Sequence, residues 1–469
     1  MGRALRGMQR GRRWLATSLA LSCAACVSVK PIDISPQSTA AAFRARSLDD
    51  EGLRNFAMRR SGALSWPLDR WDAEMLSLAA LYFNPPLEVA RARFQAAQAA
   101  ITTAGEMPNP TLSVGPQHVA NAMAGVPAWV IASTLLQIIE TAGKRDLRRM
   151  HARYLAEAVR LELINIGWDT IGAVNSALLD MAAAQRRLSA LESQVDAQSA
   201  LVEIAQRRLR AGLGSSLELA AARGALNRSL LDREASRSLL SEGHHQLGQV
   251  IGVSAETIPF ERLDLAPRDS APSPEFLGAI RREAVLNRAD LLAKVASYAA
   301  QETTLQLELA RQYPDIEIGP GYEYDQGAHK WGVSVSVPIP VFNQNQGAIG
   351  EAIAHRRQAA NEVFSVQARV IGEVDRAIAA YDSAARAFGA ADELARRQRG
   401  EFAAKERLLE RGEIDRLELL SGRVELTTAE LAKADAEASL AKARLAIEVA
   451  SQRMIDGFDP VPFILDRTR

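Results

Sequence analysis

The sequence predicts a mainly α-helical protein with a smaller β part, built as two tandem repeats of a β-hairpin and a long coiled-coil helical hairpin. Three observations predict this fold class. A glycine-centred stretch occurs twice along the chain. The flanks of both copies carry apolar residues at every seventh position. Segments in which apolar and polar residues alternate precede each set of flanks. Such an internal repeat indicates one architecture made of two similar halves.

The repeated stretch predicts the tip of a helical hairpin in each half. Gly212 in Arg210–Leu219 matches Gly412 in Glu410–Leu419. Glycine adopts the left-handed conformation that ends a helix at little cost. A new helix is expected to begin at once, because a capping box follows each glycine, Ser215-x-x-Glu218 and then Asp415-x-x-Glu418.

The flanks of the two tips predict helices packed as coiled coils. The residues at seven-residue spacing before the tips are Val174, Met181, Leu188, Val195, Val202 and Leu209, and Val374, Tyr381, Phe388, Ala395, Phe402 and Leu409. Those after the tips are Leu219, Leu226, Arg233, Leu240 and Leu247, and Leu419, Leu426, Lys433, Leu440 and Ile447. A strict seven-residue period is typical of a coiled-coil seam. The helices over about 144–210 and 348–411 would each be roughly 100 Å long.

Each long hairpin is preceded by a shorter helix and a pair of strands. We expect helices over 74–103 and 274–311, each followed by two segments of about ten residues that alternate with period two. These are 110–119 and 129–139 in the first half, and 315–324 and 332–339 in the second. The predicted repeats are 71–255 and 256–455, and the tail 456–469 is expected to be irregular.

The strand segments have the length that a tilted membrane strand needs, with one apolar and one polar face. Membrane barrels start at about eight strands, and an open sheet edge cannot be left in lipid. If these four strands span a membrane, several copies of the chain must therefore contribute to one barrel. The alternative is a pair of soluble hairpins attached to a helical bundle.

The N-terminus predicts a signal peptide over residues 1–25. Five arginines precede a short apolar run and small residues, which is typical of secretory signals. The end of the run, Leu21–Cys26, resembles a bacterial lipoprotein box, with Cys26 as the preferred lipidated residue and Cys23 as the alternative. Two incidental cysteines in an ordinary signal are the other interpretation. Residues 26–70 then form a lipid-anchored extended arm, and regular structure is expected to begin near Asp72.

Composition and motifs argue against an enzyme or a nucleic-acid-binding protein. The 469 residues contain 56 basic and 56 acidic side chains, so net charge gives no reason to expect a nucleic-acid partner. The chain has no phosphate-binding glycine loop, HExxH or Gly-x-Ser-x-Gly motif. No cofactor is predicted. The histidines lack ligand spacing, so no metal site is predicted either: they are His118, His151, His244, His245, His329 and His355.

Taken together, the order of elements behind a lipoprotein-like signal resembles the outer-membrane efflux (TolC-type) family over about residues 70–455. Three stretches resemble its heavy-metal (cobalt-zinc-cadmium, CzcC-like) branch: Asn109–Leu112, Glu140–Arg145 and Pro340–Gly347. The chain departs from the branch at Ala142-Gly143, where two glycines are usual.

The resemblance implies a homotrimer, with a twelve-stranded barrel in the outer membrane and an α-helical tunnel in the periplasm. Such a duct passively conducts substrate, here heavy-metal cations, from an inner-membrane RND-type pump and a periplasmic membrane-fusion adaptor to the outside. It implies an acidic ring at the aperture, Glu218 and Glu418, whose other role is helix capping. It implies adaptor contacts at the tips, Gly212, Leu213, Gly214, Gly412, Glu413 and Ile414, which otherwise serve the turn.

The alternative function is a non-channel periplasmic coiled-coil lipoprotein with a structural or adaptor role. Its strands would pack in a soluble domain. Four alternating segments and the twofold repeat favour the duct.

The lipoprotein-like box predicts acylation at the new N-terminus. Mass spectrometry of the mature protein should show a lipid-modified Cys26 with nothing upstream. A free Val27, or an N-terminus further along the chain, would contradict this expectation.

Overall fold

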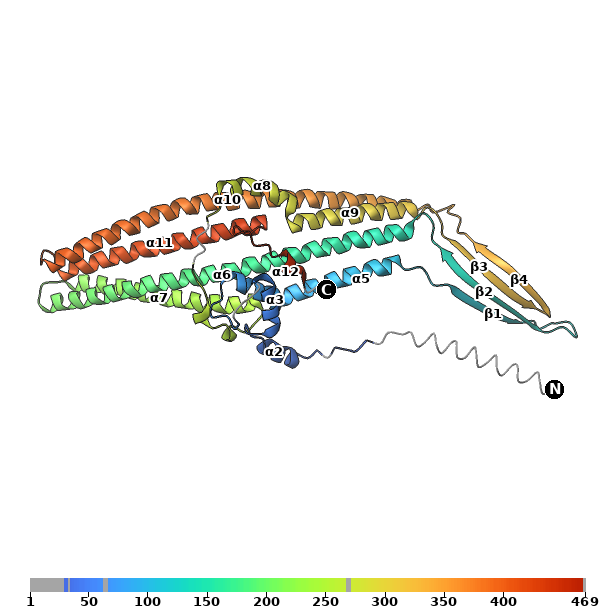
Figure 1. Cartoon of the computed structure of the whole chain (residues 1–469), viewed down its shortest axis with the longest axis horizontal. Helices are drawn as coiled ribbons and strands as arrows, with labels where there is room; N and C mark the ends of the chain where they lie inside the picture. The colour runs from blue at the N-terminus through green and yellow to red at the C-terminus, as the bar shows by residue number, and fades with distance from the viewer. Residues whose placement is uncertain (1–28, 33, 62–65, 267–270, 467–469) are drawn as a thin grey trace. The chain divides into compact units, whose positions relative to one another are not determined.

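The computed structural model describes residues 29–32, 34–61, 66–266 and 271–466, which fall into two units. The first unit ends at Arg46 and contains α2 (Pro36–Arg44), whose N-terminus has a capping box between Ser35 and Ser38. The second unit begins at Ser47 and contains every other described element (Figure 1). None of the helices in the described residues is both long and apolar enough to cross a membrane.

Two long helical hairpins form most of the second unit, as the sequence predicts. The first is α6 (Lys144–Arg210) with α7 (Ser216–Ile251), and the second is α10 (Gln346–Glu410) with α11 (Arg416–Ser451). At 67 residues, α6 is about 100 Å long. Every residue of the predicted seven-residue seams is buried or half-buried. Each seam contains one charged residue at the equivalent position, Arg233 or Lys433. Lys433 contacts Asp392 across its hairpin at 2.7 Å, whereas Arg233 contacts the adjacent Glu234.

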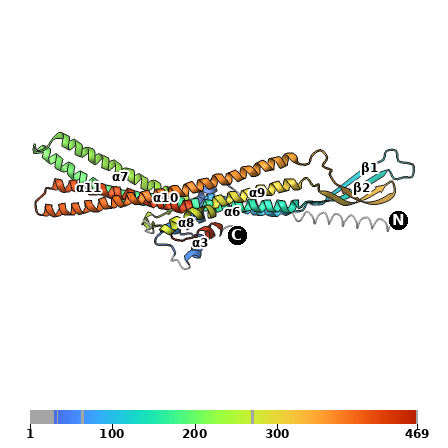
Figure 2. The same ribbon diagram turned by 90° about the horizontal axis from the view of Figure 1, so that it is seen from above.

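The two hairpins lie side by side because α11 packs against α6, which gives the order α7, α6, α11, α10. Beyond the ends of α7 and α11, shorter helices continue the packing along the same long helices. There α5 (Pro85–Gly105) packs on α6 (Figure 1), and α9 (Ala289–Ala310) packs on both α6 and α10 (Figure 2). Each long helix therefore has one set of partners near its tip and another near the sheet.

A four-stranded antiparallel sheet lies at the other end of the helices from the two tips (Figure 1). Its order is β1 (Thr111–His118), β2 (Trp129–Ile139), β3 (Ile316–Asp325), β4 (Ala328–Ser336). All four predicted strands are present, but β4 is displaced: it begins four residues before the predicted segment 332–339 and ends three residues before that segment does. The central pair joins the repeats, because β2 belongs to the first and β3 to the second. The outer edges of β1 and β4 have no partner within the described chain.

The helices before the strands differ from the prediction, because each is broken once. α4 (Ala73–Phe83) and α5 are separate at Asn84, and α8 (Pro274–Asn287) and α9 are separate at Arg288. The two breaks are equivalent. Asn84 Nδ2 donates to the carbonyl of Val250 at 2.7 Å, and Arg288 Nη1 donates to that of Ala450 at 3.0 Å. At each break, a polar side chain therefore bonds to the C-terminal end of the second helix of the hairpin, α7 or α11.

Regular structure also occurs where it was not expected, at both ends of the second unit. The expectation that it begins near Asp72 is wrong, since α3 (Glu51–Ser61) precedes that residue and buries Leu53 and Phe56. The tail is not wholly irregular, since α12 (Val461–Leu465) buries Ile464 against Gly167, where a Cβ would meet the Ile464 side chain at 2.4 Å.

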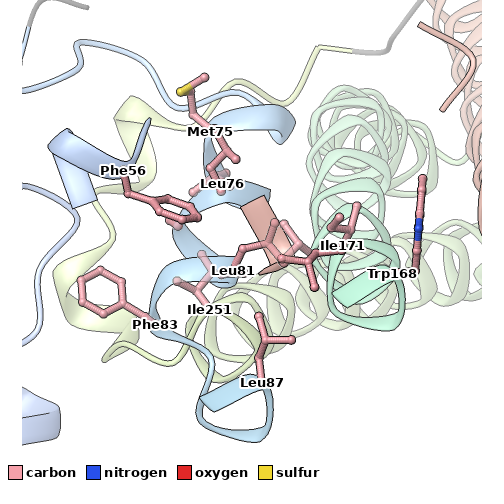
Figure 3. Close-up of a cluster of buried hydrophobic side chains, with 14 of the residues drawn as sticks. Phe56, Met75, Leu76, Leu81, Phe83, Leu87, Trp168, Ile171 and Ile251 are labelled. Carbon is pink, nitrogen blue, oxygen red and sulfur yellow. The ribbon is translucent and has the colours of Figure 1, made fainter. Parts of the chain in front are cut away.

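These terminal segments belong to the main hydrophobic core. Side chains from α3, α4, α6 and α7 meet there, together with residues of the connection that contains the short helices η1 (Ala255–Thr257) and η2 (Phe260–Arg262) (Figure 3). Arg262 also ties this connection to the chain before α4, because it donates to the carbonyl of Leu68 and contacts Asp49 at 3.1 Å. The apolar residues are too widely separated in sequence for a periodic pattern to reveal this core.

Arg288 forms the centre of a buried ionic network at the second break. Its side chain is 7% exposed and forms two hydrogen bonds with Asp290, at 2.9 and 2.7 Å, and one with Glu373, at 2.6 Å. Arg369 contacts the same two carboxylates, at 3.0 and 3.2 Å. Burial would raise the pKa of Asp290, but the hydrogen bonds and charge of Arg288, aided by Arg369, outweigh it and lower that pKa. Asp290 therefore contributes stability above its ordinary pKa that is lost as pH falls through the lowered value.

Replacing Arg288 with methionine should destabilise the fold strongly. The change would leave Asp290 and Glu373 without their buried cation, which typically costs about 3–5 kcal/mol. The control is Arg281→Met, because Arg281 and its partner Asp375 are 61% and 53% exposed, and an exposed pair contributes about 0–1 kcal/mol. Thermal unfolding followed by circular dichroism should show a much lower midpoint for Arg288→Met than for the control. The difference should shrink in acid, where Asp290 is protonated. Equal midpoints at neutral pH would contradict this account.

Candidate functional site

The four strands present one strongly apolar face. In the antiparallel register, Leu112 lies opposite Leu135, Ile318 opposite Val335, and Tyr322 opposite Trp331, and directly opposed residues share a face. Every large hydrophobic strand residue that is exposed lies on this one face: Leu112, Val114, Trp129, Ile131, Leu135, Ile139, Ile318, Trp331, Val333 and Val335. We call it the apolar face. A folded monomer rarely exposes so continuous an apolar surface to water.

The opposite face of the sheet carries the charged strand residues. Glu317, Glu323 and Asp325 of β3 lie there with Lys330 of β4, and Lys330 Nζ contacts Glu323 at 3.1 Å and Asp325 at 2.7 Å. Serine, threonine and glycine occupy most of the remaining positions. The first repeat alternates less cleanly, because Val130, Leu136 and Ile138 of β2 are on this face, where they are half-buried. The sheet is therefore amphipathic, with its clearest contrast in β3 and β4.

The junction between the sheet and the helices is fixed by contacts of Lys144, whose role the sequence did not reveal. Lys144 is 8% exposed, and its ammonium donates to the carbonyl of Tyr313 at 2.5 Å and to Asp315 Oδ1 at 2.8 Å. The backbone N–H of Thr141 donates to the same carboxylate oxygen at 2.9 Å. These bonds join the end of β2 to the start of β3. In the sequence, the only sign of this link is Asp315, an aspartate that directly precedes the second pair of strands.

Both long helices start from a residue in the left-handed conformation. Gly143 has a φ of 67° before α6, and Asn345 has a φ of 65° before α10. Ala142 also has a positive φ, 53°. This is the position at which the resemblance led us to expect glycine, and an alanine there is strained by about 1–2 kcal/mol. The departure in sequence is therefore a local energetic cost at Ala142.

The two tips have the same backbone geometry. Gly212 and Gly412 have φ values of 72° and 73°, which confirms the predicted left-handed glycines. The next N–H in each copy, Leu213 or Glu413, donates back to the carbonyl of Arg208 or Leu408, at 2.8 and 2.9 Å. This pairing closes the end of each helix as a Schellman motif. Two turns of different sequence therefore have one shape.

The capping boxes agree with the prediction in the first tip and in half of the second. Ser215 Oγ accepts from the N–H of Glu218 at 3.1 Å, and Glu218 Oε2 accepts from the N–H of Ser215 at 3.2 Å. In the second tip Asp415 Oδ1 accepts from the N–H of Glu418 at 2.9 Å. The return bond from Glu418 is missing there, among the residues described, so the box predicted for the second tip is incomplete.

The tips differ in what they expose. Leu213 and Leu217 of the first tip are 72% and 77% exposed. At the second tip Glu413 is exposed, and Ile414 is half-buried. Gly214 is half-buried, whereas Gly212 and Gly412 are exposed. Glu218 and Glu418 are exposed in the first turns of α7 and α11, which belong to separate hairpins.

Cys26 and Cys23 lie outside the described residues. Among the described residues, no three or more His, Cys, Asp or Glu side chains are grouped so as to hold a metal ion. His244 and His245 bond to backbone carbonyls, those of Ile258 and Ser241. Burial lowers the pKa of His151.

Comparison with known families identifies the architecture. The model of the outer membrane efflux protein family matches residues 76–253 and 280–451, one match in each repeat. The chain belongs to this family. Its fold is that of channel proteins, and the family is one of the outer membrane.

The relatives of this efflux protein differ in the compounds for which they are named. It is 25% identical over 229 residues to the cobalt-zinc-cadmium resistance protein CzcC of Cupriavidus metallidurans, covering 48% of this chain and 54% of CzcC. It is 28% identical to the fusaric acid resistance protein FusA of Burkholderia cepacia, covering 65% of this chain and 59% of FusA. It thus spans little more than half the length of these two relatives. Identity to CyaE of Bordetella pertussis is 26%, with 72% of both chains covered.

Solved structures show the same fold. The outer-membrane channel OprN has a TM-score of 0.66 at 19% identity, covering 91% of this chain and 98% of OprN. CusC has a TM-score of 0.63 at 16% identity, covering 91% of this chain and 99% of CusC. VceC of Vibrio cholerae has a TM-score of 0.64 at 15% identity, covering 81% of this chain and 95% of VceC. The predicted fold class is confirmed.

Proposed function

We propose that this efflux protein is the outer-membrane exit duct of a tripartite system. Three copies would form one duct, with the sheets closed into a barrel and the helices into a periplasmic tunnel. A periplasmic membrane-fusion adaptor and an inner-membrane RND-type pump would deliver the substrate. The duct itself conducts passively and needs no cofactor.

The apolar face of the sheet carries this proposal. It is exposed, continuous over four strands and backed by a polar face, which is the pattern of strands between lipid and an aqueous lumen. The unpaired edges of β1 and β4 cannot be left in hydrocarbon, where an unsatisfied backbone group costs several kcal/mol. Three copies of a four-stranded sheet give twelve strands and remove every edge. A soluble coiled-coil lipoprotein would leave both the face and the edges uncovered.

Heavy-metal cations are the proposed substrate. Similarity to the cobalt-zinc-cadmium resistance protein CzcC supports this choice, as do the three stretches that resemble its branch. The excess of carboxylates on the polar face is compatible with it, because three acidic residues face one lysine there. Anions would be repelled from a lumen of this charge.

The tips are the proposed contact with the adaptor, and their first turns the proposed aperture. Gly212, Leu213 and Gly214 of one tip, with Gly412, Glu413 and Ile414 of the other, end the helices farthest from the sheet. The exposed Leu213 offers an apolar contact. Glu218 and Glu418 follow immediately and would form one acidic ring when three chains assemble.

Lipid anchoring through Cys26, or alternatively Cys23, is part of the same proposal. A lipidated N-terminus in addition to the barrel would hold the chain at the outer membrane. The signal peptide over residues 1–25 would be removed on export.

Neutralising the proposed ring should abolish its selectivity and leave the assembly intact. Like charges within a Debye length of about 8 Å attract cations at physiological salt, and acidic rings select cations in pores. Glu218→Gln with Glu418→Gln removes these charges while an amide oxygen can still accept the bond from Ser215. Single-channel recordings should show that cation preference is largely lost and that block by a trivalent cation disappears.

The matched control is Glu256→Gln with Glu275→Gln, which removes the same number of exposed carboxylates far from the tips. It should leave selectivity and block unchanged. If the tip variant forms a normal trimer but conducts like the parent, Glu218 and Glu418 serve only as caps. Absence of any conductance from the parent protein would overturn the duct itself.

A further inference from the structure

Residues 337–341, which follow β4, continue the pattern of the strand but form no strand in the described chain. β4 ends at Ser336, and large apolar side chains follow at every second position: Val337, Ile339 and Val341. They are 43%, 81% and 67% exposed. They fall at the same alternate positions as Val333 and Val335 of the apolar face, so a strand that continued through residue 341 would extend that face.

The two pairs of strands match each other residue by residue. Asn109–Pro116 aligns with Tyr313–Pro320, and both segments have proline at the second position and Gly-Pro at the end. The second strand of each pair aligns through a shared tryptophan and through the left-handed residues Gly143 and Asn345, which precede α6 and α10. The following positions therefore correspond: Leu112 and Ile316, Val114 and Ile318, Trp129 and Trp331, Gln137 and Ile339, Ile139 and Val341.

The end of β2 has a partner that the end of β4 lacks. β2 runs past Thr111, where β1 begins, and its last residues, 137–139, are paired with β3 on the other side. β4 runs past its neighbour in the same way, because Ser336 lies opposite Glu317 and β3 begins at Ile316. On its other side β4 is the edge of the sheet. In the repeat, the place of β3 beside β2 is taken there by β1 of a second copy.

The backbone groups have the direction that such a pairing needs. Along an antiparallel strand, the N–H and C=O groups of successive residues point alternately to one neighbour and to the other. The N–H of Val119 donates to the carbonyl of Ala128 at 2.7 Å. The register carries this alternation across the sheet, so that even-numbered residues of β1 and odd-numbered residues of β4 direct their backbone groups to the open edges. Val114 therefore points outward, as Ile339 and Val341 would in a continued β4.

The prolines of the segment fit the same arrangement. Pro338 and Pro340 are even-numbered, so in a continued strand their backbone would point to the side of β3, beyond the residue at which β3 begins. Proline is tolerated in a strand only where no ladder bond needs its N–H. Pro320 obeys this rule inside the sheet, since its backbone points to β2 and the pairing of β2 with β3 is interrupted at that residue. The open edge thus keeps every N–H that a partner strand needs from the segment.

We propose that residues 337–341 become the end of β4 only when β1 of a second copy pairs with them. The register follows from two pairs within one chain, Gln137 with Ile318 and Ile139 with Ile316. Between copies, the corresponding pairs are Ile339 with Val114 and Val341 with Leu112. In the described chain the N–H of Val341 donates instead to the carbonyl of Ile339 at 2.9 Å, which is a γ-turn, and assembly replaces this bond. The inference rests on the proposed function, because it assumes that copies close one sheet.

Cysteine pairs in the full-length protein can measure this register. Ser113→Cys and Pro340→Cys occupy the positions that correspond to Glu317 and Ile138, which lie opposite each other within one chain. Both residues direct their backbone away from the shared edge, and side chains approach more closely in such a pair. We expect oxidation to give covalent dimers and trimers. The matched control, Ser113→Cys with Ser336→Cys, is displaced by about 13 Å along the strand and should give none.

A proline substitution tests the backbone bonds separately. Ile339→Pro removes the N–H that donates to the second copy, whereas Ile339→Ala shortens the side chain and keeps that N–H. We expect the fraction of protein recovered as trimer on native gels to be several-fold lower for Ile339→Pro than for Ile339→Ala. Gln117→Cys with Ser336→Cys has the same register as the first cysteine pair and leaves the segment unaltered, should Pro340→Cys assemble poorly.

The outcomes separate the inference from the function on which it rests. Cross-linking of Ser113→Cys to Ser336→Cys in place of Pro340→Cys overturns the extended strand while leaving copies paired at these edges. Equal trimer fractions for the proline and alanine variants also overturn it. If no pair of β1 and β4 positions gives a covalent species, including Gln117→Cys with Ser336→Cys, the copies do not meet at these edges. That result overturns the proposed barrel together with the inference.

Discussion

The structure depends on one constraint, which is that the strands of the described chain leave both edges of the sheet open. Its apolar face is exposed, and the outer edges of β1 and β4 are open. The described part of the chain supplies four strands, all of them already in the sheet, so it offers none to cover these edges. Copies of the same chain can cover the edges, and lipid can cover the face. On the proposed function, the assembly and the contact with the membrane would both follow from how β1 to β4 are ordered.

The outermost helices, like the outermost strands, also expose surfaces that the described chain does not cover. The helices are arranged side by side as the strands are, in the order β1, β2, β3, β4. At the junction with the sheet their order is α5, α6, α9, α10, and near the tips it is α7, α6, α11, α10. The outermost helices of the tip layer expose large side chains, such as Leu231 of α7 and Leu394 of α10. The contacts of Lys144 with Tyr313 and Asp315 join the helical part to the sheet at the place where β2 and β3 meet the helices. A neighbour that completes the sheet is therefore placed to complete the helical layer as well.

Sequence periodicity predicted the parts of the fold in which one pattern runs uninterrupted. The seven-residue seams, the left-handed Gly212 and Gly412 and all four strands were predictable for this reason. The break at Asn84 has a local signal that the prediction missed, because Pro85 and Pro86 cannot continue a helix and Asn84 caps the next one. The break at Arg288 has no such signal, and its contact with Ala450 was visible only in the structure. Phe56 and Ile464 enter the core through tertiary contacts that no local pattern encodes. Among the site residues, the tips followed from the repeat, whereas the link from Lys144 to Asp315 required the structure.

The most direct test of the central claim is a disulfide between the open edges of different copies. Gln117→Cys in β1 would be combined in turn with Lys330→Cys, Gly332→Cys, Ser334→Cys and Ser336→Cys in β4, with Thr134→Cys and Gly321→Cys, which lie opposite each other within one chain, as the positive control. The account predicts that at least one β1–β4 pair yields covalent dimers and trimers on oxidation. Efficient closure of the control pair, without any covalent species larger than one chain from the β1–β4 pairs, would contradict it.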